Sequence, residues 1–212
     1  MLVGLTRRPL KDWDAFAKRA FDLLVGGALL LATAPVMLAI ALLIKLDSPG
    51  PVFFRQKRYG FNNRTIDVLK FRTMFHHARD PFGDRLTQRG DARITSIGAL
   101  LRRTSLDELP QLLNVMRGEM SLVGPRPHAL HAKAADRLYG DVVDGYARRH
   151  RVKPGITGWA QVNGWRGETR TEAQIENRVA HDLYYIENWS IGLDLKILVL
   201  TLWREMRSQH AF

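Results

Sequence analysis

The sequence of 212 residues predicts a mainly helical α+β fold with one small β-hairpin, attached to a membrane. Three observations predict it. The 22 residues from 23 to 44 carry no charged side chain, two β-prone segments flank a turn near residue 60, and several later segments place apolar residues at helical spacing. We therefore expect a basic amphipathic lead-in over residues 1–22, a membrane helix and turn over residues 23–51, and one globular domain over residues 52–212.

The apolar run is just long enough to cross a bilayer. At about 1.5 Å per residue it reaches roughly 33 Å, against a hydrocarbon core of roughly 30 Å. Pro35 favours a bend because it cannot donate a backbone hydrogen bond, and the Thr33 hydroxyl can bond a nearby backbone carbonyl in lipid. Lysine and arginine flank both ends of the run, which favours the cytoplasmic side for both flanks. The residues alone leave two alternatives open: a kinked transmembrane helix, or a re-entrant helix that enters the membrane and returns.

The segment after the apolar run predicts a turn and then the β-hairpin. Residues 47–51 are Asp-Ser-Pro-Gly-Pro, a sequence that ends a helix. Residues 52–54 and 65–69 are β-prone, and residues 59–63 between them are typical of a turn. Residues 76–93 mix charges, glycine and proline, which indicates a mobile or substrate-covering loop.

The remainder of the chain predicts helices. Residues 97–103 place apolar side chains at helical spacing beside two arginines, which indicates a short amphipathic helix at the membrane interface. Further helices are expected over residues 107–117, 134–149 and 172–187. Residues 191–203 are strongly apolar but contain one acidic and one basic residue and are too few to span comfortably, so we expect core packing or interfacial attachment.

Composition restricts the class of partner. The absence of cysteine excludes disulfides, thiol catalysis and cysteine-bound metals. Lysine and arginine total 32 against 21 acids, a net charge of +11, and residues 45–105 alone hold thirteen basic and five acidic side chains. A basic excess directly after the apolar run favours an acidic membrane surface or a phosphorylated substrate over nucleic acid. The alternative is a solvated basic face without a partner.

Two adjacent carboxylates, Asp107 and Glu108, are the sharpest candidates for chemistry. A carboxylate can attack phosphorus to form an acyl phosphate, while its neighbour holds a divalent cation such as Mg²⁺. A structural alternative stays open, because Ser105 with Glu108 three residues later has the spacing of a helix capping box. Pro110 argues against that box, since it would fall where a helical amide is normally bonded.

Four motifs occur in order along the chain. They are Lys-Phe-Arg-Thr-Met at residues 70–74, Ser-Leu-Asp-Glu-Leu-Pro-Gln-Leu-Leu-Asn-Val at 105–115, Ser-Leu-Val-Gly-Pro-Arg-Pro at 121–127 and Lys-Pro-Gly-Ile-Thr-Gly-Trp-Ala-Gln-Val-Asn-Gly at 153–164. With these motifs the chain, from about residue 18 to residue 203, resembles the bacterial sugar transferase family, the monotopic polyprenyl-phosphate phosphoglycosyl transferases.

The resemblance implies an enzyme that moves a sugar-1-phosphate from a UDP-sugar to undecaprenyl phosphate, releases UMP and begins surface polysaccharide synthesis. Asp107 matches the family's nucleophile, and Glu108 matches its paired acid, so the two are the implied Mg²⁺ ligands. Similarity around residues 125–129 and 164–169 to members that use UDP-glucose or UDP-galactose favours a hexose. The family also implies a re-entrant membrane helix that enters the bacterial inner membrane from its cytoplasmic face. The catalytic domain, over residues 52–212, is then expected at that same face.

Further site residues are predicted from their chemistry and their place in the motifs. Four cations are expected to stabilise phosphate charge, although each could instead be a surface or packing residue: Lys70, Arg72, Arg102 and Arg126. Three residues of the last motif are expected around the nucleotide or sugar, with a turn anchored by a buried tryptophan as the alternative: Lys153, Gln161 and Asn163.

The sequence differs from many members of this family in two respects. Many members have Ser-Pro at the membrane bend where this chain has Ala34-Pro35, and longer members carry further segments ahead of this region. The chain could therefore be a short natural form or the catalytic module of a longer protein.

Two other hypotheses for the function are a membrane-tethered basic nucleic-acid-binding module and a structural membrane anchor. We expect no nucleic acid, because neither stacking aromatics nor a groove-reading helix is evident among the basic residues, and the sequence is compatible with a homodimer.

Overall fold

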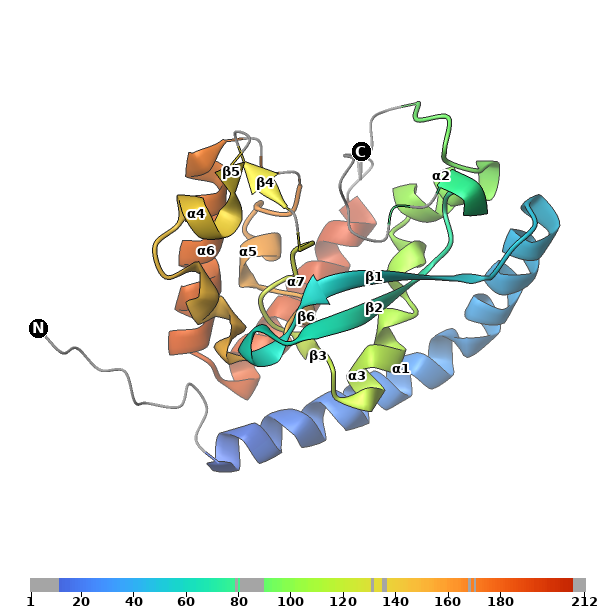
Figure 1. Ribbon diagram of the computed structural model, residues 1–212. Helices are drawn as coiled ribbons and strands as arrows, with labels where there is room; N and C mark the ends of the chain where they lie inside the picture. Colours follow the sequence, from blue (N-terminus) through green and yellow to red (C-terminus); the bar gives the residue numbers. More distant parts are fainter. Residues whose placement is uncertain are drawn as a thin grey trace, which may run out of the picture.

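The computed structural model describes residues 12–78, 80, 90–130, 132–134, 137–167, 169 and 171–207. Helix α1, Asp12–Asp47, is the longest element and curves around one side of the molecule, concave toward the other elements (Figure 1). Residues 1–11 of the predicted lead-in, and residues 79 and 81–89 of the predicted loop, lie outside the described residues. The expected mainly helical fold with small sheets is confirmed.

Helix α1 is continuous through Pro35 and leaves much of its apolar surface uncovered. Leu24, Leu31 and Leu38, spaced by seven residues, are between 74% and 78% exposed. The Thr33 hydroxyl donates to the Leu29 carbonyl at 2.8 Å, the type of bond expected from the sequence. Within the described part of the chain, α1 is the one helix long and apolar enough to cross a membrane by length and composition.

The predicted hairpin is confirmed and is longer than expected. Strand β1, Phe53–Tyr59, pairs antiparallel with β2, Thr65–Phe71, and the turn between them contains Asn62 and Asn63 at positive φ. The far end of β2 packs Phe71 against Ile40 and Ile44 of α1. The hairpin therefore rests on the carboxyl-terminal half of the apolar helix.

A short parallel sheet lies in the centre of the fold. Strand β3, Ser121–Val123, pairs with β6, Gly155–Thr157, and both contact α7, Ile191–Arg207. A side chain at Gly155 would meet the Gly124 amide nitrogen at 2.1 Å, so the two backbones approach this closely only with glycine. The close pairing fixes where the chain leaves β3 and enters the Pro-Arg-Pro segment.

Most predicted helices form, and one is wrong. The confirmed ones are α2, Ser96–Arg103, and α6, Glu172–Glu187, while the helix expected over 107–117 is split into a 3₁₀ turn η3, Leu106–Glu108, and α3, Gln111–Arg117. Between residues 134 and 149 no long helix forms among the described residues. The segment contains two-residue strands β4, Lys133–Ala134, and β5, Arg137–Leu138, a one-turn helix α4, Tyr139–Val142, and a 3₁₀ helix η4, Tyr146–Arg151. Gly145, at φ 73°, interrupts the segment, and two tyrosines bury against α6 instead.

Smaller elements complete the chain. The 3₁₀ helices η1, Phe61–Asn63, and η2, His76–Ala78, follow the first two strands, and α5, Trp159–Val162, joins β6 to the loop before α6. Helix α7 matches the expectation of core packing in part. Its Ile197 is fully buried, but Val199 and Leu202 on another face are more than 60% exposed.

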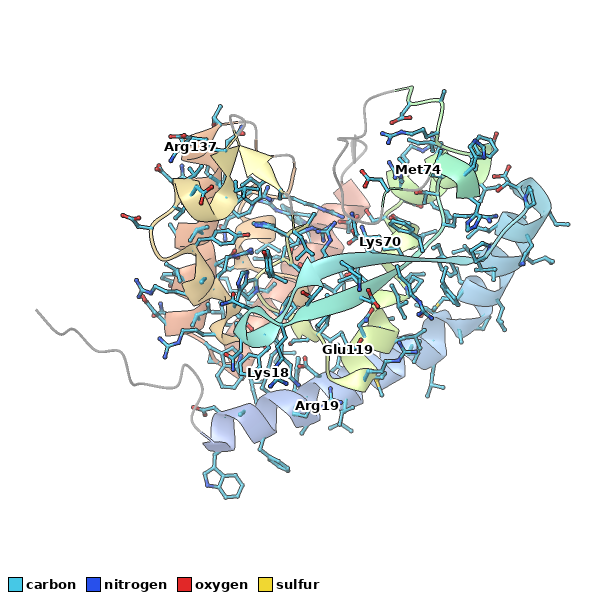
Figure 2. All side chains as sticks on the ribbon, viewed as in Figure 1. Lys18, Arg19, Lys70, Met74, Glu119 and Arg137 are labelled. Atoms are coloured by element: carbon cyan, nitrogen blue, oxygen red, sulfur yellow. The ribbon has the colours of Figure 1, made fainter. Side chains whose placement is uncertain are left out.

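A buried polar cluster, here called the anchoring cluster, fastens the start of α1 to the body. The Lys18 ammonium lies 3.2 Å from an Asp22 oxygen and 2.7 Å from an Asp194 oxygen on α7. Asp22 also accepts hydrogen bonds from the Ser121 hydroxyl and the Leu122 amide of β3. Lys18 and Arg19, labelled in Figure 2, therefore project from α1 toward the body.

Candidate active site

Three separate segments bring charged side chains together around Glu108. Lys70 (labelled in Figure 2) comes from β2, Glu108 from η3, and Arg126 from the loop after β3. One Glu108 oxygen lies 2.8 Å from the Lys70 ammonium and 2.5 Å from Arg126 Nη2, and the other lies 3.1 Å from Arg126 Nη1. The bidentate guanidinium contact is the strongest form of such a pair. Glu108, Lys70, Arg126 and the adjacent Asp107 are called the reactive cluster below.

The local backbone shows why both carboxylates are available. Ser105 adopts a left-handed conformation, φ 57°, which costs energy for a residue with a Cβ atom, and its side chain caps no helix. The capping box is therefore wrong. Helix α3 begins instead after Pro110, which needs no amide at that position. Ser105 instead accepts a hydrogen bond from Arg166. The side chains of Asp107 and Glu108 are therefore available to the reactive cluster.

The two neighbouring carboxylates have opposite electrostatic environments. Burial alone would raise the pKa of Glu108, but the charges of Arg126 and Lys70 outweigh it and hold that pKa well below its ordinary value. Burial raises the pKa of Asp107, which Lys70, 3.9 Å away, only partly opposes. Within the described structure, Asp107 accepts no hydrogen bond although it is only 8% exposed. Glu108 is thus a fixed anion, and Asp107 is the carboxylate with free oxygens.

Of the other predicted cations, one lies near Asp107 and one does not. Arg102 donates from Nε to the Thr73 hydroxyl at 2.8 Å; burial lowers its pKa, and the charge of Asp107 partly restores it. Arg72 is not brought into the cluster. Its buried guanidinium donates to the carbonyls of Ser48, Pro49 and Ile44 and so closes the carboxyl end of α1. A phosphate-binding role for Arg72 stays a prediction without a contact to support it.

The three predicted residues of the last motif do not contact Glu108 in the described structure. Burial, followed by the charge of Arg19, lowers the pKa of Lys153. The Gln161 amide donates to the Ile156 carbonyl at 3.3 Å, and its buried oxygen has no partner among the described residues. The exposed Asn163 donates to the Trp159 carbonyl at 2.7 Å. Their predicted role at the nucleotide or sugar remains a prediction.

The structure adds two arginines that the sequence analysis missed. Arg58 of β1 donates to the Pro127 carbonyl at 2.5 Å, and burial together with the charge of Arg126 lowers its pKa to about 10. Arg166 pairs with Glu205 and lies within electrostatic reach of both carboxylates. In the sequence, Arg58 is one of the basic residues that follow the apolar run. The signal that could have found it is strand alternation, which separates it from its neighbour Lys57 on the two faces of β1.

Buried contacts hold the backbone that carries Arg126. Arg149, 1% exposed, makes two hydrogen bonds to Asp182 of α6, at 2.9 and 2.6 Å, and donates to the Arg126 carbonyl at 2.6 Å. The next carbonyl, of Pro127, is the one that Arg58 binds. Two arginines therefore fix consecutive peptide groups, so that the Arg126 side chain is preorganised toward Glu108.

The arrangement suits chemistry on a phosphate ester. It combines a carboxylate with free oxygens, a neighbouring carboxylate held as an anion, and several cations in a partly desolvated place. No group of three histidine, aspartate or glutamate side chains able to hold a metal occurs in the described ranges. Asp107 and Glu108 could still supply two oxygen ligands to a cation that is also bound by phosphate.

Comparison with known proteins agrees with this chemistry. The bacterial sugar transferase family matches residues 13–208. The chain is 56% identical over 211 residues to an undecaprenyl-phosphate glucose phosphotransferase of Komagataeibacter xylinus, covering 100% of this chain and 40% of the relative. It is 49% identical to a UDP-glucose:undecaprenyl-phosphate glucose-1-phosphate transferase of Escherichia coli K12, covering 100% of this chain and 45% of that protein. It is also 49% identical to the exopolysaccharide production protein PSS of Rhizobium leguminosarum, covering 94% of this chain and 100% of the relative. The chain thus spans less than half of the first two relatives and the whole of the third.

Proposed function

Because this chain belongs to the bacterial sugar transferase family, we propose that it transfers glucose-1-phosphate from UDP-glucose to undecaprenyl phosphate and releases UMP, thereby initiating exopolysaccharide synthesis. The names of the two longer relatives support the donor and the acceptor. The observation that carries the proposal is the pair Asp107 and Glu108: Glu108 is fixed between Lys70 and Arg126, and Asp107 accepts no hydrogen bond from the residues that the structure describes.

In the proposed first step, an Asp107 oxygen attacks the β-phosphorus of UDP-glucose. A bond forms between that oxygen and phosphorus, the bond from the β-phosphorus to the bridging oxygen breaks, and UMP leaves with the electron pair. In the second step an oxygen of undecaprenyl phosphate attacks the same phosphorus and displaces Asp107, which regains its carboxylate. Asp107 must be ionised to attack, and the nearby Lys70 ammonium favours that form.

The cations of the cluster stabilise negative charge as it moves from the carboxylate to the departing phosphate. Arg126 is held in place by Glu108 and by its own backbone contacts, so little reorganisation is needed during the reaction. Glu108 limits the positive charge around Asp107 and orients both Lys70 and Arg126. Arg102 lies on the Asp107 side of the cluster.

Mg²⁺ is the proposed cofactor, and the residues present fit it. Asp107 offers oxygens without a hydrogen-bond donor in the described structure, and Glu108 is its direct neighbour. Mg²⁺ commonly binds to one or two carboxylates together with substrate phosphates, so two protein ligands are sufficient. When bound, the ion would add positive charge at the phosphate oxygens. Chelation with EDTA should abolish UMP release, and added Mg²⁺ should restore it.

We further propose that α1 is re-entrant, with both ends at the cytoplasmic face of the inner membrane. The support is that both ends are bonded to the same body. The start is tied through Lys18 to Asp194 of α7, and the end through Ser48 to Arg72. Ends on opposite sides of a core roughly 30 Å thick could not both make these contacts.

Cysteine labelling tests this topology, because the chain has no cysteine of its own. Ala15→Cys and Arg55→Cys, both at exposed positions, should react with a membrane-impermeant maleimide from the same, cytoplasmic side. Leu31→Cys, exposed within the apolar run, is the control that should react only after detergent is added. Reaction of the first two from opposite sides contradicts the re-entrant path.

The transferase activity is tested with purified protein, UDP-glucose and undecaprenyl phosphate. We expect UMP release by the unaltered chain and a covalent glucose-phosphate adduct detected by mass spectrometry on Asp107. Asp107→Asn should lower the rate by about 10³-fold or more, because an amide is a poor nucleophile. Asp67→Asn, at an exposed acid of β2, is the matched control and should leave the rate unchanged. Full activity of Asp107→Asn would refute the assignment.

A further inference from the structure

An open hollow lies beside the reactive cluster, between the hairpin and the Pro-Arg-Pro segment. In the free protein it encloses no space large enough for a water molecule, so an anion would bind at its solvent-facing mouth. The lining residues are Arg58, Val68, Lys70, Gln111, Arg126 and Pro127. Three of these side chains are cationic, and the adjacent carboxylate of Glu108 is shared between two of them. Positive charge is therefore in excess at the hollow.

Arg58 is the lining cation without an acidic partner. In the described ranges no carboxylate lies within ion-pair distance of it. Its Nε and Nη2 both donate to the Gln56 side-chain oxygen, at 3.2 and 2.7 Å, and Nη1 donates to the Pro127 carbonyl. A guanidinium has five N–H groups, so two are left over for a ligand. A half-buried charge of this kind is stabilised when an anion binds beside it.

Gln111 gives a second, independent sign of a missing ligand. Its side chain is only 2% exposed, yet no hydrogen bond to it is formed within the part of the chain that the structure describes. The polar end of this side chain keeps a narrow contact with solvent, since its atoms are not among the fully buried side-chain atoms without a partner. The amide can donate to an oxygen that enters the hollow from the solvent side.

We propose that this hollow is a phosphate-binding subsite, in which Arg58 and Gln111 bind substrate together with Lys70 and Arg126. The proposal rests on the transferase function. It adds two substrate-binding residues and a location for the bound phosphate. The ligand is a phosphate group, supplied either by the nucleotide that leaves as UMP or by the lipid acceptor. An anionic phosphate matches the excess of three cations over the two carboxylates, Asp107 and Glu108, that pair with them.

Two variants and one control test the subsite. Arg58→Gln removes the charge, and Gln111→Leu removes the amide while leaving Arg58 in place. Lys57→Gln is the control, because Lys57 is the exposed neighbour of Arg58 on β1 and its loss changes the net charge equally. Each protein is titrated calorimetrically with UMP and with inorganic phosphate, and the KM for each substrate is measured together with kcat.

We expect Arg58→Gln to weaken phosphate binding by about tenfold or more, Gln111→Leu to weaken it less, and Lys57→Gln to leave it unchanged. Weaker UMP binding with a raised KM for UDP-glucose identifies the nucleotide phosphate. A raised KM for undecaprenyl phosphate, with unchanged UMP binding, identifies the lipid phosphate. A role of Arg58 in holding Pro127 alone would lower kcat or thermal stability and leave both KM values unchanged.

Unchanged phosphate and UMP binding, with both KM values unchanged in folded Arg58→Gln and Gln111→Leu, overturns the subsite. If Arg58→Gln fails to fold, Gln111→Leu alone decides by the same measurements. Failure of the transferase function gives a different result, since the unaltered chain would then release no UMP. The calorimetric titrations with phosphate need no turnover, so they test phosphate binding at the subsite even if the chain has no transferase activity.

Discussion

The anchoring cluster and the reactive cluster contain the same kinds of side chain but differ in how completely they are bonded. In the anchoring cluster one ammonium lies between two carboxylates, and Asp194 also accepts from the Tyr185 hydroxyl at 2.8 Å and the Trp189 ring nitrogen at 3.3 Å. In the reactive cluster Asp107 accepts no hydrogen bond from the described residues, and the Lys70 ammonium lies 3.9 Å from it. The difference separates a cluster that stabilises the fold from one that is completed by a ligand.

The physical basis of the contrast is desolvation. Charges taken out of water repay the cost only when hydrogen bonds satisfy them fully, as they do around Asp194. In the proposed subsite, Arg58 and Gln111 have fewer partners among the described residues, and they would gain that compensation from a bound phosphate. We therefore expect changes in the anchoring cluster to act mainly on stability and changes in the reactive cluster to act mainly on rate.

The largest effect on stability is expected from Asp194→Ala. Asp194 is fully buried, and its loss removes the closest partner of the Lys18 ammonium. Breaking such a pair should lower the free energy of unfolding by about 3–5 kcal/mol. Thermal unfolding in detergent measures it. A loss below about 1 kcal/mol would show that Asp22 alone suffices for Lys18 and would weaken the contrast between the clusters.

Arg126→Gln should act on rate instead. The variant keeps a hydrogen-bonding side chain next to Glu108 but removes the charge that is proposed to stabilise the phosphate. We expect the rate of UMP release to fall by about 10²-fold, or about 2.7 kcal/mol in the barrier, with a small change in unfolding temperature. A rate that falls only as much as the folded fraction falls would place Arg126 with the structural residues.

Tyr185→Phe tests the anchoring cluster more gently. The change removes one hydroxyl, which can donate its single proton to Asp194 at 2.8 Å or to the Val123 carbonyl at 3.0 Å, and leaves the ring in the core. The free energy of unfolding should fall by about 1.5 kcal/mol, because the hydrogen bond is made to a charged acceptor. Turnover per folded molecule should be unchanged, and a selective loss of turnover would contradict the separation of the two clusters.

The smallest predicted change is a displacement of a pH profile. Burial raises the pKa of Asp107, and Lys70 lowers it, so Lys70→Met should raise that pKa further. Protonated Asp107 cannot attack, so the acidic limb of the kcat profile should move to higher pH. The rate at low pH then falls more than the rate at high pH. A limb that stays in place or moves to lower pH would show that another group controls it.

Local patterns in the sequence predicted the elements whose stabilising contacts are also local. Two β-prone segments around a turn predicted the β1–β2 hairpin, apolar side chains at helical spacing predicted α2, and a helix was also predicted over the residues of α6. The helix over 134–149 failed because two tyrosines there gain more from packing on α6 than the segment gains from helix propensity. That gain depends on contacts roughly 30 to 40 residues away in sequence, which a local pattern does not contain.

The acidic residues of the site could be predicted from the sequence, but only some of its cationic residues could. Adjacent carboxylates in an ordered motif identified Asp107 and Glu108 as the candidate pair. The cations needed the tertiary structure, since Arg72 turns toward the end of α1 whereas Arg58, from the opposite strand, faces Arg126. The left-handed Ser105 was equally hidden, because its strain is held by a hydrogen bond from Arg166, 61 residues later.

The bonding of α1 to β3 has a consequence for the bilayer itself. Asp22 is bonded to the Leu122 amide, and the same strand leads within four residues to Arg126, so helix and site move as one unit. With α1 in lipid as proposed, the depth of the helix sets the height of the site relative to the headgroup phosphates. Hydrophobic mismatch then changes the distance between enzyme and acceptor. Acyl-chain length in reconstituted vesicles should therefore alter turnover with undecaprenyl phosphate while leaving UMP binding unaffected.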